Sequence, residues 1–140
     1  MSEAGGIPTK ALPPIGPESE VYWQGCSEGR LLLQKCAPCG HVQFYPRLLC
    51  TACGGEQLDW HEASGKGIVK SFTIIRRAVS AAYEADVPYV VALIELAEGP
   101  TMMSNVVGCE VETVAIGMPV GVAFEAYSEA VTVPVFKPEA

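Results

Sequence analysis

Two pairs of cysteines constrain the fold of this chain more than any other feature. They are Cys36 and Cys39, then Cys50 and Cys53, with ten residues between the pairs. Each Cys-x-x-Cys turn directs two sulfurs at one ion, and two such turns complete a tetrahedral site with metal–sulfur bonds of about 2.3 Å. Gly40 and Gly54 directly follow the two pairs, where the backbone has to fold around the sulfurs. The spacing therefore predicts one metal site with four cysteine ligands.

The expected metal is zinc in a structural role, with one ion per chain. Four thiolates leave the ion no open position at which water could be activated. Iron suits the same ligands, as in rubredoxin, so an electron carrier remains an alternative. Zinc is favoured because the sequence shows no other redox apparatus. We interpret His41 as a surface residue, and Cys26 and Cys109 as small buried apolar residues.

The charge balance bears on the class of partner. The 140 residues include 9 basic and 16 acidic side chains, giving a net charge of -7. Such a chain repels polyanions, so nucleic-acid binding is disfavoured, although a single-stranded nucleic-acid-binding module remains an alternative. No apolar run approaches the roughly 20 residues of a membrane span, and residues 1–17 contain no signal-peptide core. We expect a cytoplasmic protein without membrane contact.

The order of elements predicts a mainly β chain. Residues 1–17 are rich in Gly and Pro and are predicted to form a flexible tail. Residues 18–63 are predicted to form a helix over 18–27 and then a zinc ribbon, with strands at 30–35, 42–45 and 57–62 around the two knuckles.

Residues 64–140 are predicted to form a small barrel. β-Branched and aromatic residues recur in five segments separated by turns. These segments are residues 68–79, 88–97, 101–107, 118–127 and 131–136. Five such strands suit a closed barrel, which leaves no exposed sheet edge.

The sequence shows no catalytic signature. His41 and His61 lie outside every familiar hydrolase or metalloprotease motif, and no Gly-rich phosphate loop is present. We therefore do not expect the chain to be catalytic alone. The basic residues that could meet a phosphate are Arg47, Lys70, Arg76 and Arg77, although solvated surface charge is the simpler interpretation.

A succession of short motifs resembles one known family. In order they are Gly29-Arg30-Leu31, Lys35-Cys36-Ala37-Pro38-Cys39-Gly40, Phe44-Tyr45-Pro46-Arg47, Cys50-Thr51-Ala52-Cys53, Ser64-Gly65-Lys66-Gly67, Ser71-Phe72-Thr73, Pro88-Tyr89, Val91-Ala92, Glu98-Gly99-Pro100, Ile116-Gly117-Met118-Pro119-Val120 and Pro134-Val135-Phe136. The chain resembles small proteins with an N-terminal rubredoxin-like zinc ribbon and a C-terminal acyl-CoA-associated OB-fold. The resemblance covers nearly all of the chain from about residue 18.

The resemblance implies a role in an enzyme complex. Members of this family bind thiolase-like enzymes that act on acyl-CoA by thiolysis or condensation, acyl transfer, or retro-aldol cleavage of steroid side-chain CoA esters. The thiolase-like partner carries the catalytic residues, and a hetero-oligomer of two plus two chains is expected. Acyl-CoA becomes a candidate ligand, with the four basic residues above as candidates for its phosphates. We expect the Tyr22-Trp23 region either to join the partner interface or to cap the core of the ribbon.

Overall fold

The computed structural model describes residues 15–78, 80–126 and 131–139. Most of the predicted flexible tail, residues 1–14, lies outside the described residues. Within the described part of the chain, no helix has the length and apolarity that a membrane span requires.

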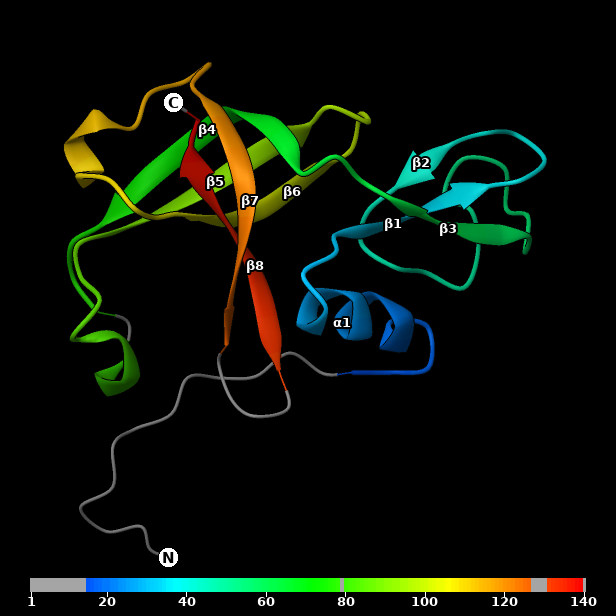
Figure 1. Cartoon of the computed structure of the whole chain (residues 1–140), viewed down its shortest axis with the longest axis horizontal. Coiled ribbons are helices and arrows are strands. Elements are labelled where there is room, and N and C mark those ends of the chain that lie inside the picture. The colour runs from blue at the N-terminus through cyan, green and yellow to red at the C-terminus, as the bar shows by residue number, and fades with distance from the viewer. Residues whose placement is uncertain (1–14, 79, 127–130, 140) are drawn as a thin grey trace, which may run out of the picture.

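A short helix and a three-stranded sheet form the N-terminal part (Figure 1). Helix α1 spans Glu20–Ser27, and the strands are β1 (Leu32–Cys36), β2 (Val42–Gln43) and β3 (Leu58–Glu62). The sheet order is β2-β1-β3, with both pairings antiparallel. This is the predicted order of strands and knuckles.

Strand β2 is two residues shorter than predicted because aromatic packing removes its end from the sheet. Phe44 and Tyr45 lie against Tyr22 of α1, with ring centroids 5.6 and 5.5 Å from that ring. Each contact is tilted towards an edge-to-face geometry, which aromatic pairs prefer. After Gln43 the chain therefore leaves the sheet, and Phe44 and Tyr45 pack against the helix instead.

The C-terminal part is a closed five-stranded barrel. Its strands are β4 (Lys66–Ile75), β5 (Tyr89–Leu96), β6 (Thr101–Val106), β7 (Pro119–Ala126) and β8 (Thr132–Pro138). They pair in the order β4-β5-β6-β8-β7, and β7 returns to β4. The β6–β8 pairing is parallel and the other pairings are antiparallel. This closed barrel confirms the predicted OB-fold class.

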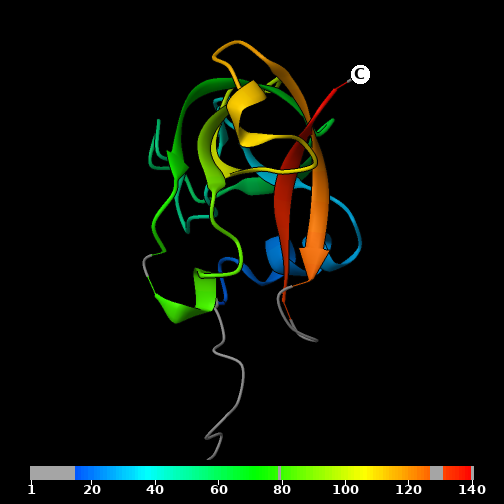
Figure 2. The same ribbon diagram turned by 90° about the vertical axis from the view of Figure 1, so that its left-hand side faces the viewer.

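Two short 3₁₀ turns lie in the connections of the barrel. They are η1 (Ala81–Tyr83), between β4 and β5, and η2 (Val111–Thr113), between β6 and β7. Both lie at the end of the barrel away from the ribbon. This end of the barrel faces the viewer in Figure 2.

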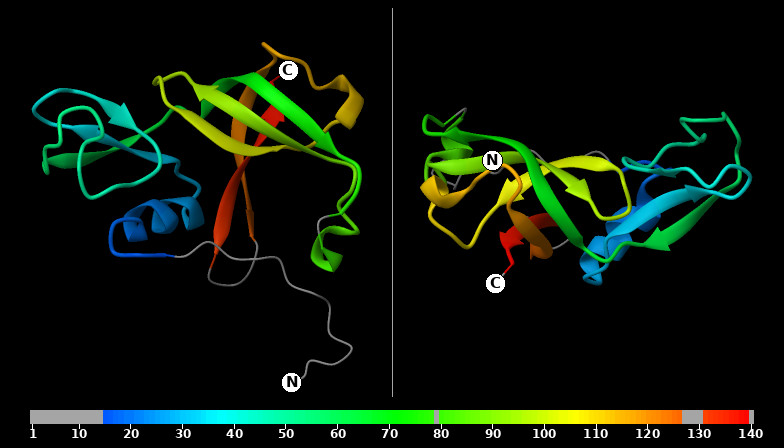
Figure 3. Two further views of the ribbon diagram at one scale, coloured as in Figure 1. Left: turned by 180° about the vertical axis from the view of Figure 1, so that it is seen from behind. Right: turned by 90° about the horizontal axis from the view of Figure 1, so that it is seen from above.

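Helix α1 joins the two parts. It packs against β1 of the ribbon and against β7 and β8 of the barrel, as Figure 3 shows. Tyr22, which was expected either to join a partner interface or to cap the core of the ribbon, is only 1 % exposed. Its ring fills the space between helix and ribbon, so the core-capping alternative is correct for this residue. Trp23 is half-buried beside it and donates from Nε1 to the Tyr45 hydroxyl at 2.9 Å.

The connection between ribbon and barrel is short and closely held. The amide of Ala63 donates to the Leu31 carbonyl at 2.8 Å, and the amide of Ser64 donates to Glu98 Oε2 at 2.8 Å. The carbonyl of Gly65 accepts from the amide of Val122 at 2.8 Å. The segment at the boundary between the two parts is therefore anchored to both of them.

Candidate metal centre

The four predicted ligands converge at one end of the ribbon. The sulfurs of Cys36, Cys39, Cys50 and Cys53 all lie within 4.8 Å of one another. The Cys36–Cys53 and Cys39–Cys50 sulfur pairs are each 3.6 Å apart. A tetrahedron with bonds of about 2.3 Å has ligand–ligand distances of about 3.8 Å, so the cluster has the size that zinc requires.

The two knuckles share one backbone geometry. The amide of Gly40 donates to the Cys36 carbonyl at 2.8 Å, and the amide of Gly54 donates to the Cys50 carbonyl at 2.9 Å. Both glycines have φ of +77°, in the left-handed region that residues with a Cβ rarely enter. This confirms the reason inferred for a glycine after each cysteine pair.

Backbone amides favour the thiolate form at the second knuckle. The amide of Cys53, 3.5 Å from the Cys50 sulfur, lowers the pKa of the Cys50 thiol to about 6, and the amide of Ala52 acts in the same direction. A thiolate is the form of cysteine that binds metal. With four sulfur donors the coordination sphere is complete, so the site fits a structural zinc and leaves no position for a substrate.

The other residues predicted to lie outside the metal site do so. His41 Nε2 lies 3.1 Å from the Thr51 hydroxyl, and His41 is not among the clustered ligands. Cys26 is buried in the core beside Tyr22, and burial raises the pKa of its thiol to about 11. Cys109 is half-buried against the same core.

Sequence reasoning missed a pair of buried glutamines beneath the second knuckle. Gln43 Nε2 donates to Gln34 Oε1 at 2.9 Å. Gln34 also accepts from the amide of Arg47 at 2.8 Å and donates to the Arg47 carbonyl at 2.9 Å. Gln43 accepts from the amide of Thr51 at 2.9 Å and donates to the Leu49 carbonyl at 3.2 Å. Residues 47–51 are thus held to the sheet by two side chains. The available signal was a glutamine, Gln34, directly after the apolar run Leu31-Leu32-Leu33.

Both parts of the chain match described domain families. Residues 23–59 match the model "ChsH2, rubredoxin-like zinc ribbon domain", and residues 60–125 match "ChsH2, C-terminal OB-fold domain". The chain is 37% identical over 100 residues to a "DUF35 domain-containing scaffold protein" of Pyrococcus furiosus, covering 71% of this chain and 72% of that protein. The chain belongs to the DUF35 family.

Two further proteins similar to this DUF35 chain are described as an enzyme subunit and as an aldolase. A "Probable enoyl-CoA hydratase alpha subunit" of Thermomonospora curvata is 35% identical over 126 residues, which cover 90% of this chain but only 39% of that protein. A solved structure described as "Ltp2-ChsH2(DUF35) aldolase" contains a chain that is 35% identical, with a TM-score of 0.82. The match covers 91% of the DUF35 chain and 98% of that one.

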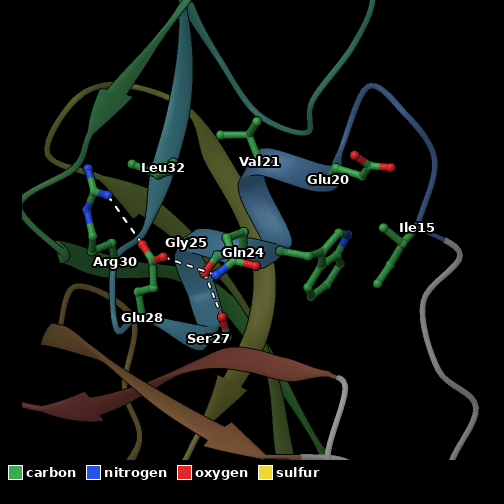
Figure 4. Close-up of a pocket in the computed structure, with 10 residues that line it drawn as sticks. Ile15, Glu20, Val21, Gln24, Gly25, Ser27, Glu28, Arg30 and Leu32 are labelled. Atoms are coloured by element: carbon green, nitrogen blue, oxygen red, sulfur yellow. Dashed lines mark hydrogen bonds and ion pairs between the residues drawn. The ribbon is translucent and has the colours of Figure 1, made fainter.

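A hollow of about 590 Å³ lies on the outer side of α1 (Figure 4). Its apolar side chains are Ile15, Val21, Trp23 and Leu32. Its one cation is paired, since Arg30 donates to Glu28 at 3.4 Å, and Gln24 donates to the same carboxylate at 3.0 Å. Arg30 also pairs with Glu62 at 3.1 Å. This hollow therefore offers apolar surface rather than a free cation for a phosphate.

The DUF35 fold does not bring the four basic candidates together. Arg47 lies in the ribbon, and Lys70 lies within β4. Arg76 and Arg77 follow the end of β4, on the side of the barrel away from the ribbon (Figures 1 and 3). Arg76 also pairs with Glu112 at 3.3 Å. All four are exposed, and Arg47 is separated from Arg76 and Arg77 by the barrel.

Proposed function

We propose that this chain is a non-catalytic accessory subunit that binds a thiolase-like enzyme acting on acyl-CoA. The reaction is thiolysis or condensation, acyl transfer, or retro-aldol cleavage. The chain stabilises that enzyme and helps to position the CoA ester. The observation that carries the proposal is its likeness to the DUF35 chain of the Ltp2-ChsH2 aldolase, along 98% of the length of that chain. The family resemblance of the sequence motifs supports a thiolase-like identity for the partner.

The chemistry of the metal centre supports the non-catalytic part of the proposal. Four sulfurs complete the coordination of the ion, so it cannot polarise a carbonyl or activate water. The two histidines of the chain lie in the ribbon segment, and His41 is engaged with Thr51. The reacting groups are therefore expected on the partner.

Several finer features belong to the same proposal. We propose one structural zinc bound by Cys36, Cys39, Cys50 and Cys53, a cytoplasmic location, and an assembly of two plus two chains. Residues 18–63 act as the helix and ribbon unit and residues 64–140 as the barrel unit. If CoA touches this chain, its phosphates meet either Arg47 or the barrel group of Lys70, Arg76 and Arg77, because the barrel lies between Arg47 and Arg76.

Native purification tests the proposal. The tagged protein is expressed in its source cell, purified gently and analysed by mass spectrometry for associated proteins. A thiolase-like protein in near-stoichiometric amount is the expected result. Recovery of the chain alone, or with nucleic acid, would count against the proposal. Iron with a visible thiolate absorption band would instead favour the electron-carrier alternative.

Calorimetry with CoA and an acyl-CoA tests the ligand part. Binding to the complex, compared with binding to the isolated chain, shows whether this chain contributes. Arg47→Gln and the double variant Arg76→Gln/Arg77→Gln compare the two alternative phosphate contacts. A loss of CoA affinity in one variant identifies the contact. Wild-type CoA affinity in both variants removes these residues from the CoA site.

A further inference from the structure

The loop that leads into the second knuckle exposes two leucines. Leu48 is 73 % exposed and Leu49 is 48 % exposed, between the buried residues Pro46 and Cys50. Apolar side chains of this size usually lie in a core. Two adjacent ones at the tip of a loop give a compact apolar projection, with Arg47 exposed beside them.

The loop is held rigid in this outward conformation. Gln34 bonds both the amide and the carbonyl of Arg47, and Gln43 bonds the carbonyl of Leu49. Cys50, the next residue, is a metal ligand. The backbone therefore cannot rearrange to fold the leucines inward without breaking these partly buried hydrogen bonds. A projection that is already ordered loses little conformational entropy when it binds.

The surroundings of the loop resemble the centre of an interface. A hollow of about 510 Å³ next to it is lined by Glu18, Tyr45 and the loop itself. Tyr45 accepts the hydrogen bond from Trp23, which in turn lines the apolar hollow outside α1. Aromatic residues and Arg are enriched in protein interfaces relative to the rest of the surface. Tyr45 and Trp23 thus connect the hollow beside Leu48 with the hollow outside α1, where Ile15 and Val21 are each 44 % exposed.

The charges point to the kind of partner. Among the described residues nothing pairs with the Arg47 guanidinium, whereas Arg30 and Arg76 each contact a carboxylate. An unpaired cation beside two leucines complements an apolar pocket with an acidic rim. A second copy of this chain fits less well, because each copy carries a net charge of -7.

We propose that Arg47, Leu48 and Leu49 form a docking projection for the thiolase-like enzyme. The two leucines enter an apolar pocket of that enzyme, and Arg47 meets a carboxylate at the rim. This inference rests on the proposed function and names the surface through which it is exerted.

The test measures the affinity of variants for the thiolase-like subunit that co-purifies with the wild-type chain. Leu48→Ser/Leu49→Ser is expected to weaken binding at least about tenfold, as loss of a central apolar contact does. Arg47→Glu is expected to slow association and to reduce its dependence on salt. Ile116→Ser is the matched control, because Ile116 is 72 % exposed and lies in the segment before β7, in the barrel. It is expected to bind like the wild type.

Zinc content and thermal unfolding establish that each variant is folded. Four other outcomes would contradict the inference, each in a different way. Wild-type affinity of the double leucine variant would remove the loop from the interface while leaving the accessory function intact. A wild-type chain that binds no thiolase-like subunit would instead overturn the proposed function itself. If the isolated chain forms a dimer and the leucine substitutions dissociate it, the projection binds a second copy of the chain and not the enzyme. Amide exchange at residues 47–49 that slows only when residues 1–14 are present would mean that residues 1–14, and not the enzyme, cover the projection.

Discussion

At the scale of single residues, Gly65 occupies a point where no side chain fits. Its φ is +85°, and an added Cβ would lie 2.5 Å from Val122 Cγ1. Gly65→Ala is therefore expected to lower the free energy of unfolding by about 3 kcal/mol, from backbone strain and steric overlap together. Urea unfolding measures the loss.

Gly117→Ala is the matched control for this prediction. Gly117 also has a positive φ, of +89°, but an added Cβ would meet nothing within 4 Å. Only the strain of the left-handed backbone remains, so we expect a loss of about 1 kcal/mol. Equal losses in the two variants would show that the close approach of Gly65 to β7 has no energetic weight.

Cys26 gives a residue-scale prediction of pH dependence. Burial raises the pKa of its thiol to about 11, so at pH 8 only about one thousandth is thiolate. Iodoacetamide should therefore leave Cys26 unmodified in the folded, zinc-loaded protein, and labelling should increase only as the pH approaches 11. Mass spectrometry after proteolysis locates the label. Rapid labelling of Cys26 at pH 8 would contradict its burial, and the urea-unfolded protein serves as the reactive control.

At the scale of elements, the two glutamines tie the second knuckle to the sheet. Gln43→Leu removes the partner of the Thr51 amide and of the Leu49 carbonyl. We expect a loss of about 2 kcal/mol, because partly buried polar groups remain without a hydrogen bond. Faster hydrogen exchange at the Thr51 amide should accompany it.

Gln24→Leu is the control for the element-scale prediction. Gln24 lies on the exposed side of α1, and its side-chain amide donates to an exposed carboxylate, that of Glu28. Its replacement should change stability by less than about 0.5 kcal/mol. If both variants lost the same stability, the glutamine pair would not be what holds residues 47–51.

The elements also show which features local sequence can predict. The cysteine spacing predicted the ribbon because metal geometry fixes it locally, and runs of β-branched residues predicted the barrel strands. The ends were less accurate: β4 stops at Ile75 rather than residue 79, and β8 continues to Pro138. The parallel β6–β8 pairing and the burial of Tyr22 depend on contacts between distant segments. Local patterns do not contain that information. The same holds for the pairing of the two glutamines, since Gln34 beside an apolar run does not by itself identify Gln43 as its partner.

At the scale of the whole molecule, the two parts of the chain are stabilised by different forces. The ribbon has a small core and depends on its metal, since structural zinc sites supply about 10–16 kcal/mol in isolated zinc-finger peptides. The barrel closes on itself, and its strands supply most of the apolar cluster that Tyr22 and Leu33 join from the helix and the ribbon. Five of its core residues have no exposed surface or almost none: Val69, Val90, Ile94, Val120 and Phe136. Loss of the metal should therefore unfold one part and leave the other largely folded.

The positions of the tryptophans make this separation measurable. The chain has two, Trp23 in α1 and Trp60 in β3, and none in the barrel strands, so tryptophan fluorescence follows the helix and ribbon most directly. Zinc removal with a chelator should shift the emission to the red, whereas far-UV circular dichroism should retain the signal of the barrel. Cys50→Ser should reproduce the effect, and Cys109→Ser, away from the metal, should not. Because α1 also packs on β7 and β8, the barrel of the zinc-free chain should melt at a lower temperature. Complete loss of the β signal on chelation would mean that the barrel cannot fold without the ribbon.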